Sequence, residues 1–414
     1  MNDATLFSGF FSRIGRSVKP ITVGVRAGAA GLLALGLAGC MGSTLGSYPG
    51  SSINPGDQAA ATGDLVGTGS VRVGLLLPMS ASGGSTSVGT VFRNAAELAL
   101  ANFPNADVQL LVKDTGGTAQ GGRAAAQSAI AEGAELILGP VFAPAVSGAA
   151  AVARSSGVPV VAFSTDASVA SRGVYLLSFL PQTDVKRIIG YAASQSKRSF
   201  AAILPDDTYG AVAEAAFRQE VGRAGGRIVS IQRYKLTGSD TADLIAKTNA
   251  IASVVGKVDA LFVPAGGGVA PLVVQTLTAK GADIGRVTML GSGQWDTSDM
   301  KSNPIMAGSW YPGPEDKGYQ AFAGRYQSAY GSAPPRNATL AYDGVTLAAG
   351  LVRSAGPQRF SNGVLTNRDG FIGIDGLFRF RSDGQNERGL AVYQLTGSGN
   401  QVISAAPRDF RSGT

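Results

Sequence analysis

The chain has 414 residues, of which 44% are hydrophobic and 15% charged, which is enough for two cores of ordinary domain size. It contains no histidine, which excludes His-based catalytic triads, histidine metal ligands and imidazole general bases. The single cysteine, Cys40, can form neither an internal disulfide nor a cysteine cluster for zinc. The formal net charge is +7, but the basic residues are scattered and form no run interleaved with aromatic residues. We therefore expect no nucleic-acid partner, no cofactor and no metal.

The first 39 residues are typical of a signal peptide. They hold four basic residues and one acidic residue, and they end in the apolar run Ala27–Gly39. A run of this length is too short to span a bilayer but suits the apolar part of a signal peptide. The sequence Leu37–Cys40 (LAGC) resembles the bacterial lipobox, in which the cysteine is lipidated and becomes the mature N-terminus. Met41 follows the cysteine, which in the lipoproteins that it resembles favours the outer membrane. The alternatives are an ordinary signal peptide and a chance buried cysteine.

Residues 40–69 are rich in Gly, Ser, Ala, Pro and Thr and show no periodicity. This composition predicts a flexible tether between the lipidated Cys40 and the folded part of the chain.

Apolar strands alternate with helices in the next segment, which predicts a doubly wound α/β lobe. The runs lack polar alternation, as expected of strands buried on both faces of a parallel sheet. Ligands of such sheets collect outside the carboxyl ends of the strands. The predicted strands are Val71–Pro78, Val108–Lys113, Leu136–Leu138 and Val158–Phe163, and the loops at their carboxyl ends include Met79–Ser87, Gly139–Ala145 and Ser164–Ser168.

A second α/β lobe is predicted after Pro181, where the alternation restarts. Its predicted strands are Phe200–Leu204, Arg227–Tyr234, Ala260–Val263 and Val287–Gly291. From Ala307 onward we expect a strand at Gly308–Tyr311 and two helices that pack back on the first lobe. After these helices we expect an antiparallel hairpin, whose strands are Gly376–Arg381 and Leu390–Leu395 and whose turn is Ser382–Gly384.

Four segments in this order resemble the type I periplasmic solute-binding proteins, most closely the leucine/isoleucine/valine-binding branch. The segments are LGPVFAPAV (138–146), GVPVVAFSTDAS (157–168), DDTYG (206–210) and NATLAYDGVTLAA (337–349). The resemblance implies two Rossmann-like lobes joined by three hinge crossovers, with a ligand enclosed between them by hinge closure. The crossovers are expected near Leu177–Pro181, Gly308–Pro312 and Phe378–Arg381. Lobe 1 would comprise residues 70–179 with 310–378, and lobe 2 residues 180–309 with 379–405.

The resemblance also implies site residues. Phe142–Ala145 matches the loop that holds the ligand carboxylate, and Ser164–Ser168 matches the loop that binds the carboxylate and the amine. Tyr209 matches the aromatic residue of the second lobe that packs on the ligand. The family's acidic partner for the ligand ammonium should follow Val287–Gly291, where this chain has Ser292–Asp296. Gln294 there is neutral and Asp296 comes one or two places late, while Asp166 adds a carboxylate to the first lobe. The candidate ligand-binding residues are Ser80, Ser82, Phe142, Ala143, Ala145, Ser164, Asp166, Ser168, Tyr209, Gly267, Gln294 and Asp296.

These features predict a non-enzymatic, lipid-anchored periplasmic protein that binds a small amino-acid-like solute for uptake by an ABC-type transporter. A second hypothesis stays open, because outer-membrane lipoproteins of this fold include activators of penicillin-binding proteins. The activator best known for this fold carries a helical-repeat domain before the lobes, and only about 30 tether residues occupy that place here. Two Ser-x-x-Lys matches, Ser194–Lys197 and Ser298–Lys301, lack the accompanying motifs of serine penicillin-recognising enzymes and are interpreted as chance.

Overall fold

The structure is a computed structural model that describes residues 60–81 and 85–410. The predicted signal peptide, Cys40 and Ser82 lie outside the described residues. From Ala61 onward the chain forms one compact unit. None of the helices in the described ranges combines the length and the apolar character that a bilayer span requires.

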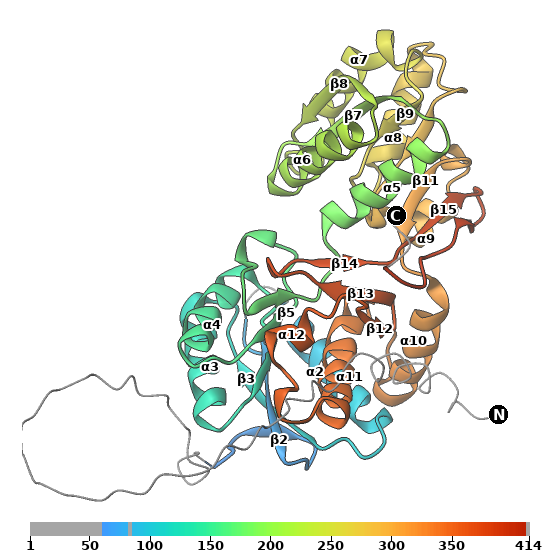
Figure 1. Cartoon of the computed structure of the whole chain (residues 1–414). Helices are drawn as coiled ribbons and strands as arrows, with labels where there is room; N and C mark the ends of the chain where they lie inside the picture. The colour runs from blue at the N-terminus through green and yellow to red at the C-terminus, as the bar shows by residue number, and fades with distance from the viewer. Residues whose placement is uncertain (1–59, 82–84, 411–414) are drawn as a thin grey trace, which may run out of the picture. The chain divides into compact units, whose positions relative to one another are not determined.

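The first sheet has the strand order β1-β3-β2-β4-β5-β6. Strands β2 to β6 run parallel and β1 pairs antiparallel with β3. Helices α3 and α4 pack on one face, and α2 and α11 lie side by side on the other (Figure 1). The strands are β1 (Asp64–Val66), β2 (Val71–Leu77), β3 (Val108–Asp114), β4 (Leu136–Leu138), β5 (Val160–Ala162) and β6 (Val174–Leu176). The helices are α2 (Ser85–Asn102), α3 (Ala119–Ala131), α4 (Ala143–Ser155) and α11 (Thr339–Ser354).

Strand β1 corrects the predicted extent of the tether. Residues 64–66 hydrogen-bond to β3, although the sequence analysis assigned everything up to residue 69 to a flexible segment. Just before this strand, the backbone N–H and hydroxyl of Thr62 donate to the buried carboxylate of Glu132, which also binds Lys113 at 2.7 Å. The folded part therefore begins several residues earlier than the composition indicates.

Glycines allow α3 and α4 to pack unusually closely. A Cβ on Gly122 would lie 2.2 Å from the carbonyl oxygen of Ala145, and a Cβ on Gly148 would lie 2.0 Å from that of Ala119. The Ala-rich faces of both helices thus bury their small side chains against the strands. This contact fixes where α4 begins, and so it fixes the loop before it.

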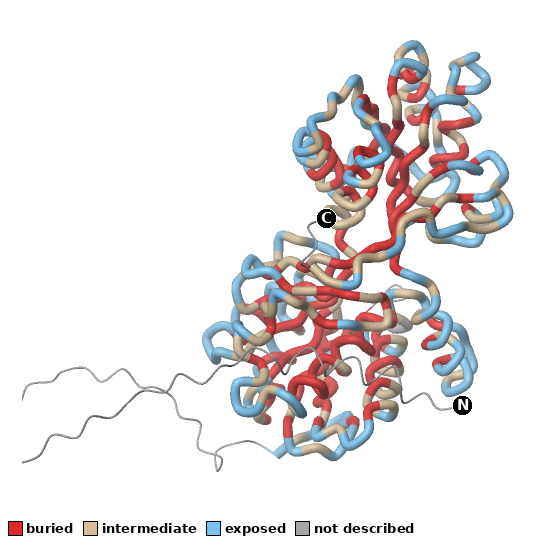
Figure 2. The backbone as a smooth tube through the Cα atoms, turned by 45° about the vertical axis from the view of Figure 1, so that its right-hand side comes forward, coloured by how far each residue is buried: buried red, intermediate tan, exposed pale blue. Residues whose placement is uncertain are grey.

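The second sheet has the strand order β16-β15-β11-β10-β9-β7-β8, in which β15 is antiparallel to both of its neighbours, β11 and β16. Helices α5 and α6 cover one face and α7 and α8 the other, and the central strands of both sheets are buried (Figure 2). The strands are β7 (Ser199–Pro205), β8 (Arg227–Tyr234), β9 (Ala260–Phe262), β10 (Thr288–Leu290), β11 (Trp310–Gly313), β15 (Ala391–Leu395) and β16 (Asn400–Ser404). The helices are α5 (Pro181–Ser194), α6 (Thr208–Arg223), α7 (Ala242–Val255), α8 (Val269–Ala279) and the short α9 (Ser298–Lys301).

A third, antiparallel sheet consists of β12 (Phe371–Gly373), β13 (Gly376–Phe380) and β14 (Asn386–Arg388). The predicted hairpin is therefore wrong in its second strand: β13 pairs with β14, and residues 391–395 join the second sheet as β15. Sequence patterning detects strands but not their partners, because pairing is a long-range property. Helices α10 (Asp316–Tyr330) and α12 (Asn362–Leu365) complete the fold.

The chain passes between the two large sheets three times, so the protein has two α/β lobes. The first passage, between β6 and α5, lies where the sequence predicts it. Strand β11 belongs to the second sheet, although the prediction assigned residue 310 onward to lobe 1. The last passage follows β14 rather than lying at residues 378–381.

Two arginines tie these passages together. Arg336 binds Asp296 at 2.9 Å, Asp316 at 2.7 Å and Asp375 at 3.1 Å, and thereby connects a loop of the second sheet to the segments that follow β11 and precede β13. Arg388 on β14 donates from Nε to the carbonyl of Ser178 in the first passage. Polar contacts therefore link the first passage to the strand that precedes the third, and hold the start of the second passage against the segment before β13.

Candidate ligand-binding site

Asp114 organises the loops at the carboxyl ends of β2 and β3. Its Oδ1 accepts the backbone N–H groups of Met79 at 2.9 Å, Ser80 at 3.2 Å and Gly116 at 2.8 Å. Burial raises the pKa of this carboxyl, but the hydrogen bonds from Ser80 and Gly116 outweigh burial and hold the pKa below its ordinary value. Asp114 thus stays ionised and keeps the exposed Ser80 in place. The sequence analysis did not select Asp114, although its position directly after a buried strand was a usable signal.

The segment from Phe142 to Ala145 is the start of α4. Phe142 is the N-cap residue, and no side chain caps the helix there. Phe142 and Ala143 are partly exposed, and a Cβ on Gly117 would meet the Phe142 ring at 3.1 Å, so the ring lies against the loop after β3. Ala145 is fully buried against α3, so its side chain cannot contact a ligand.

The loop after β5 is held by its own hydrogen bonds. The buried Ser164 accepts the backbone N–H of Asp166 at 3.1 Å, and the Asp166 carboxylate accepts the N–H of Ser168 at 2.9 Å. The hydroxyl and N–H of Ser168 lower the pKa of Asp166, which is exposed and therefore ionised. The loop presents a fixed negative charge beside Ser168, as the sequence analysis expected from Asp166.

In the second lobe, Tyr209 lies in the first turn of α6, directly after β7. Its hydroxyl donates to Ser292 Oγ at 3.1 Å, and the buried Ser292 in turn donates to the carbonyl of Pro264 at 2.6 Å. Burial raises the pKa of Tyr209 well above its ordinary range, so the phenol stays neutral. The loops after β7, β9 and β10 therefore meet at Tyr209.

Asp184 is a further candidate site residue, which the sequence analysis did not select. It lies in the first turn of α5, immediately after the first passage between the lobes, and accepts the backbone N–H of Gly293 at 2.8 Å. Burial raises its pKa to about 7 despite that hydrogen bond, and its charge in turn raises the pKa of Tyr209. Asp184 follows a crossover instead of a strand, so a search of strand ends could not find it.

Of the other candidates in the second lobe, Gln294 and Gly267 lie exposed in loops, whereas Asp296 is held in ion pairs. The exposed Gln294 accepts the N–H of Gly266 at 2.9 Å, and Gly267 beside it is exposed with a positive φ of 63°. Asp296 binds Lys301 at 2.6 Å as well as Arg336. Its side chain is only 11% exposed, so both oxygens are committed to structural ion pairs and Asp296 is not a free partner for a ligand ammonium.

The geometry therefore gathers candidate residues at the carboxyl ends of each large sheet. Ser80, Phe142, Ser164, Asp166 and Ser168 lie at the end of the first sheet. Tyr209, Gly267 and Gln294 lie at the end of the second, together with Asp184. Within the part of the chain that the structure describes, no group of three or more acidic or cysteine residues could hold a metal ion.

Two α/β lobes with polar loops at the carboxyl ends of their strands define a two-lobed binding protein. Residues 70–400 match the sequence model of the periplasmic binding protein family. The chain belongs to this family, and membership implies a periplasmic location. No curated protein matches the sequence.

Several solved structures share the fold. A Rhodospirillum rubrum protein assigned to branched-chain amino acid ABC transport is 20% identical with a TM-score of 0.70, covering 80% of this chain and 99% of its own. An ABC-transporter solute-binding protein from Rhodopseudomonas palustris, in complex with 3,4-dihydroxybenzoic acid, is 20% identical with a TM-score of 0.58, covering 82% and 98%. A leucine-binding protein from Thermotoga maritima is 18% identical with a TM-score of 0.57, covering 81% and 98%. At these identities the comparisons establish the type I fold.

Proposed function

We propose that the protein binds a small amino-acid-like solute between its two lobes and delivers it to an ABC-type membrane transporter, without catalysing a reaction. Family membership and the fold support a binding function. The observation that carries the ligand class is the carboxyl of Asp184 beside the neutral hydroxyl of Tyr209, at the end of the second sheet. This pair supplies an anionic partner for an ammonium group and an aromatic surface next to it.

The first lobe would bind the carboxylate of the ligand. Helix α4 begins at this edge of the sheet without a side-chain cap, and the positive end of its dipole favours an anion. The hydroxyl of Ser80 and the polar loop from Ser164 to Ser168 lie at the same edge. The fixed charge of Asp166 opposes a carboxylate placed close to it, so we propose that the ligand carboxylate lies on the α4 side.

The second lobe would bind the ammonium. Asp184 replaces Asp296 in this role, because Asp296 is committed to Lys301 and Arg336. Asp184 must ionise to act, and an approaching ammonium favours the ionised form. A ligand that touches both lobes favours the closed arrangement over the open one, which couples binding to hinge motion.

Anchoring through a lipid on Cys40 belongs to the same proposal and is supported by the sequence alone. Activation of a penicillin-binding protein receives no specific support from the described residues. It is therefore treated as an outcome of the experiment that follows.

The first test is thermal unfolding of the purified protein against two panels, the amino acids and benzoate-type acids that lack an ammonium group. At a concentration about a hundredfold above the dissociation constant, a ligand adds about 2.7 kcal/mol to the free energy of unfolding, which raises Tm by a few degrees. We expect amino acids to raise Tm and benzoates to leave it unchanged. A response to benzoates alone would overturn the ammonium subsite. A flat response in both panels would overturn solute binding, and a pull-down with penicillin-binding proteins would then test the activator function.

A variant pair separates the proposed ammonium partner from other acidic residues of the same lobe. Asp184→Asn keeps an oxygen that can accept the Gly293 N–H but removes the charge. Asp299→Asn removes an exposed charge on α9 and serves as the control. We expect calorimetry to show that Asp184→Asn binds the amino acid at least tenfold (about 1.4 kcal/mol) more weakly than the native protein. The affinity of Asp299→Asn should be unchanged. Equal affinities would remove Asp184 from the site.

A further inference from the structure

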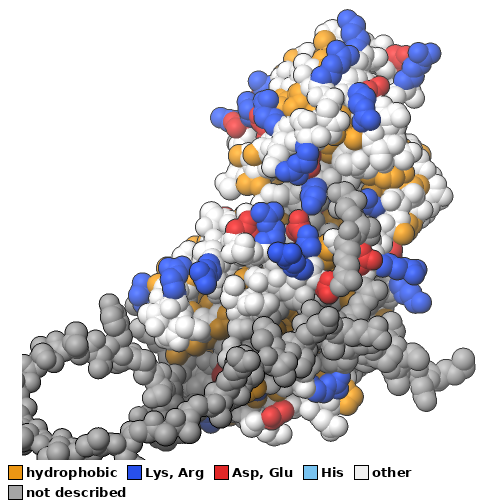
Figure 3. All heavy atoms as spheres, viewed as in Figure 1, with side chains coloured by type: hydrophobic (Ala, Val, Ile, Leu, Met, Phe, Trp, Pro, Cys, Tyr) orange, Lys and Arg blue, Asp and Glu red, His pale blue; other side chains and the backbone are white. Residues whose placement is uncertain are grey.

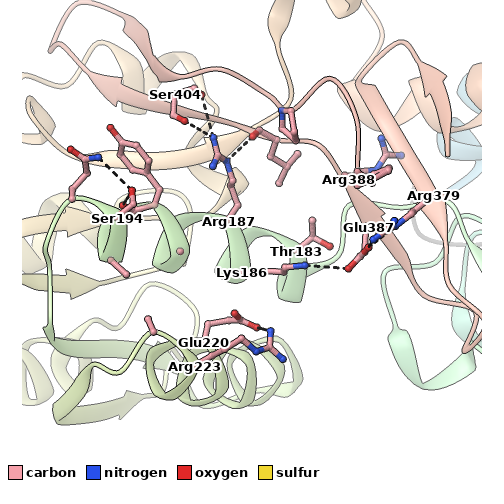
Figure 4. A pocket seen from close by; sticks show the side chains of 18 of the residues that line it. Thr183, Lys186, Arg187, Ser194, Glu220, Arg223, Arg379, Glu387, Arg388 and Ser404 are labelled. Atoms are coloured by element: carbon pink, nitrogen blue, oxygen red, sulfur yellow. Dashed lines mark hydrogen bonds and ion pairs between the residues drawn. The ribbon is translucent and has the colours of Figure 1, made fainter. Parts of the chain in front are cut away.

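A groove of about 970 Å³ lies where the second lobe meets the third sheet. It is bordered by α5 and the C-terminal end of α6, by β13 and β14, and by the segment that follows β16 (Figure 4). Its volume is near the upper end of the range of about 300–1,000 Å³ that small-ligand pockets cover. The polar side chains that line it come from segments far apart in the sequence, and Figure 4 shows Lys186, Arg187 and Ser194 on the same face of α5.

This groove is separate from the candidate solute site. Helix α5 buries Val185 and Ile188 on one face and presents Lys186 and Arg187 to the groove on another. Asp184, which faces Gly293, does not line the groove. The groove also lies at the end of α6 opposite Tyr209, because it is bounded by residues 220–224 and the helix begins at residue 208. An occupant of the groove would therefore not displace the solute.

Positive charge exceeds negative charge along the groove. Arg388 also lines the groove, but its Nε donates to the carbonyl of Ser178, which is not part of the lining. The remaining charged residues that line it are Lys186, Arg187, Arg198, Arg223 and Arg379 against Glu220 and Glu387, an excess of three positive charges. The space-filling view shows Lys and Arg side chains gathered with fewer carboxylates over the region of α5 and β14 (Figure 3).

Two of the guanidinium groups hydrogen-bond to neutral oxygens. Arg187 donates to the carbonyl of Leu390 and the hydroxyl of Ser404, both at 2.7 Å. Arg198 donates to the carbonyl of Ala193 at 2.9 Å. These bonds fix the positions of the two guanidinium groups without neutralising their charge, so the field of the groove favours an anionic occupant.

A third cation lacks a carboxylate of its own. Lys186, at 3.2 Å, and Arg379, at 2.7 Å, share the single carboxylate of Glu387. One carboxylate cannot neutralise two cations, so this end of the groove also keeps an excess of positive charge.

Apolar side chains lie beside two of the cations. The guanidinium of Arg379 stacks over Phe410 at 4.4 Å and that of Arg187 over Tyr191 at 6.0 Å, and Leu390 also lines the groove. The carboxylates of Glu220 and Glu387 would repel a ligand of uniformly dense charge, such as a polyphosphate. Because cations and apolar surface lie in the same groove, it suits an occupant that carries both carboxylates and apolar side chains.

We propose that this groove binds an acidic, extended peptide segment of a partner protein. Glu or Asp side chains of the segment would pair with Lys186, Arg187 and Arg198, whereas Arg223 is already paired with Glu220 at 2.7 Å, and the apolar side chains of the segment would cover Tyr191 and Phe410. Guanidinium groups offer paired donors that match carboxylates, which gives direction as well as charge to the contact.

The test uses a fluorescein-labelled peptide of about eight residues in which Glu and Leu alternate, long enough to span about 26 Å when extended. Its binding to the purified full chain is followed by fluorescence anisotropy, beside a matched peptide with Gln in place of Glu. We expect saturable binding of the Glu peptide alone, weakened several-fold between about 50 mM and about 300 mM salt. Absence of saturable binding, or equal binding of both peptides, would overturn the proposal.

Variants locate the binding. Lys186→Ala combined with Arg198→Ala should weaken binding of the Glu peptide at least tenfold. Lys257→Ala combined with Lys280→Ala, which removes two exposed cations of the second lobe outside the groove, should change the affinity less than twofold. Thermal unfolding of both variants checks that they fold. Equal losses in the two variants would show non-specific attraction and overturn the site. If inorganic polyphosphate displaces the peptide and binds more tightly, the peptide proposal is overturned and the groove is a polyanion site.

Discussion

Asp184→Asn tests whether the carboxyl in the first turn of α5 is protonated in the folded protein near neutral pH. Burial raises the pKa of Asp184 to about 7, whereas an aspartate in an unfolded chain ionises near pH 3.9. The folded protein therefore holds this proton more tightly than the unfolded chain does. The contribution of the Asp184 carboxyl to the free energy of unfolding is therefore greatest below pH 4. It falls as the pH rises from about 4 to about 7 and stays constant at higher pH.

The magnitude follows from the same two pKa values. One unit of pKa difference is worth about 1.36 kcal/mol, so the raised pKa of Asp184 lowers the free energy of unfolding, relative to its value at low pH, by roughly 1.5 kcal/mol at pH 5 and by roughly 4 kcal/mol at pH 8. The asparagine variant has no proton to lose and keeps an acceptor for the Gly293 N–H. Relative to the native protein, the variant should therefore gain about 2.5 kcal/mol in the free energy of unfolding between pH 5 and pH 8.

Urea unfolding at the two pH values, analysed by linear extrapolation, measures this difference. Asp343→Asn is the comparator, because burial, assisted by the nearby charge of Asp375, raises the pKa of Asp343 to about 7 and its Oδ1 accepts the N–H of Ile374 at 2.7 Å. Both variants should gain stability with rising pH, but only Asp184→Asn should weaken solute binding. In the native protein, amino-acid affinity should rise from pH 6 to pH 8 as Asp184 ionises. A stability difference that is the same at pH 5 and pH 8 would refute the reasoning.

Two further predictions concern the scaffold. Arg336→Met should lower the free energy of unfolding by about 3–5 kcal/mol, because it leaves a buried carboxylate unpaired, whereas Arg359→Met, which breaks one partly exposed ion pair, should cost less than about 1 kcal/mol. Urea unfolding measures both, and equal losses would contradict the buried network. Gly122→Ala should destabilise the protein, because the added Cβ would lie 2.2 Å from a backbone carbonyl of α4, whereas Gly222→Ala, which meets nothing within 4 Å, should stabilise it by about 0.5–1 kcal/mol. Thermal unfolding compares the two, and a Gly122→Ala protein as stable as the native one would mean that α3 and α4 can separate.

The sequence carried enough information to predict the two α/β lobes. Buried parallel strands read as uninterrupted apolar runs, as in Leu136–Leu138, and the helices between them follow from their Ala-rich or amphipathic spacing. The order of a few short segments, such as DDTYG and NATLAYDGVTLAA, indicated the type I family that the sequence model of residues 70–400 then established. These patterns depend only on residues that are close together in the chain, so a single sequence is enough to detect them.

Predictions for single site residues were less reliable. The sequence selected Tyr209, which does lie with Gln294 at the end of the second sheet. It also selected Ala145 and Asp296, which the fold uses for helix packing and for ion pairs. Their neighbours in space come from segments far away in the chain, so nothing near them in sequence revealed those roles.

Only the tertiary structure decided which charges are free and which strands pair. Asp296 is neutralised because Arg336, forty positions later, folds against it. Asp184 becomes a candidate because the loop that carries Gly293 turns onto the start of α5. Strand β13 pairs with β14 and not with β15, because β15 pairs with β11, which is distant in the sequence. The state of a charged side chain and the partner of a strand depend on distances in space, and those distances are set by packing across the whole chain.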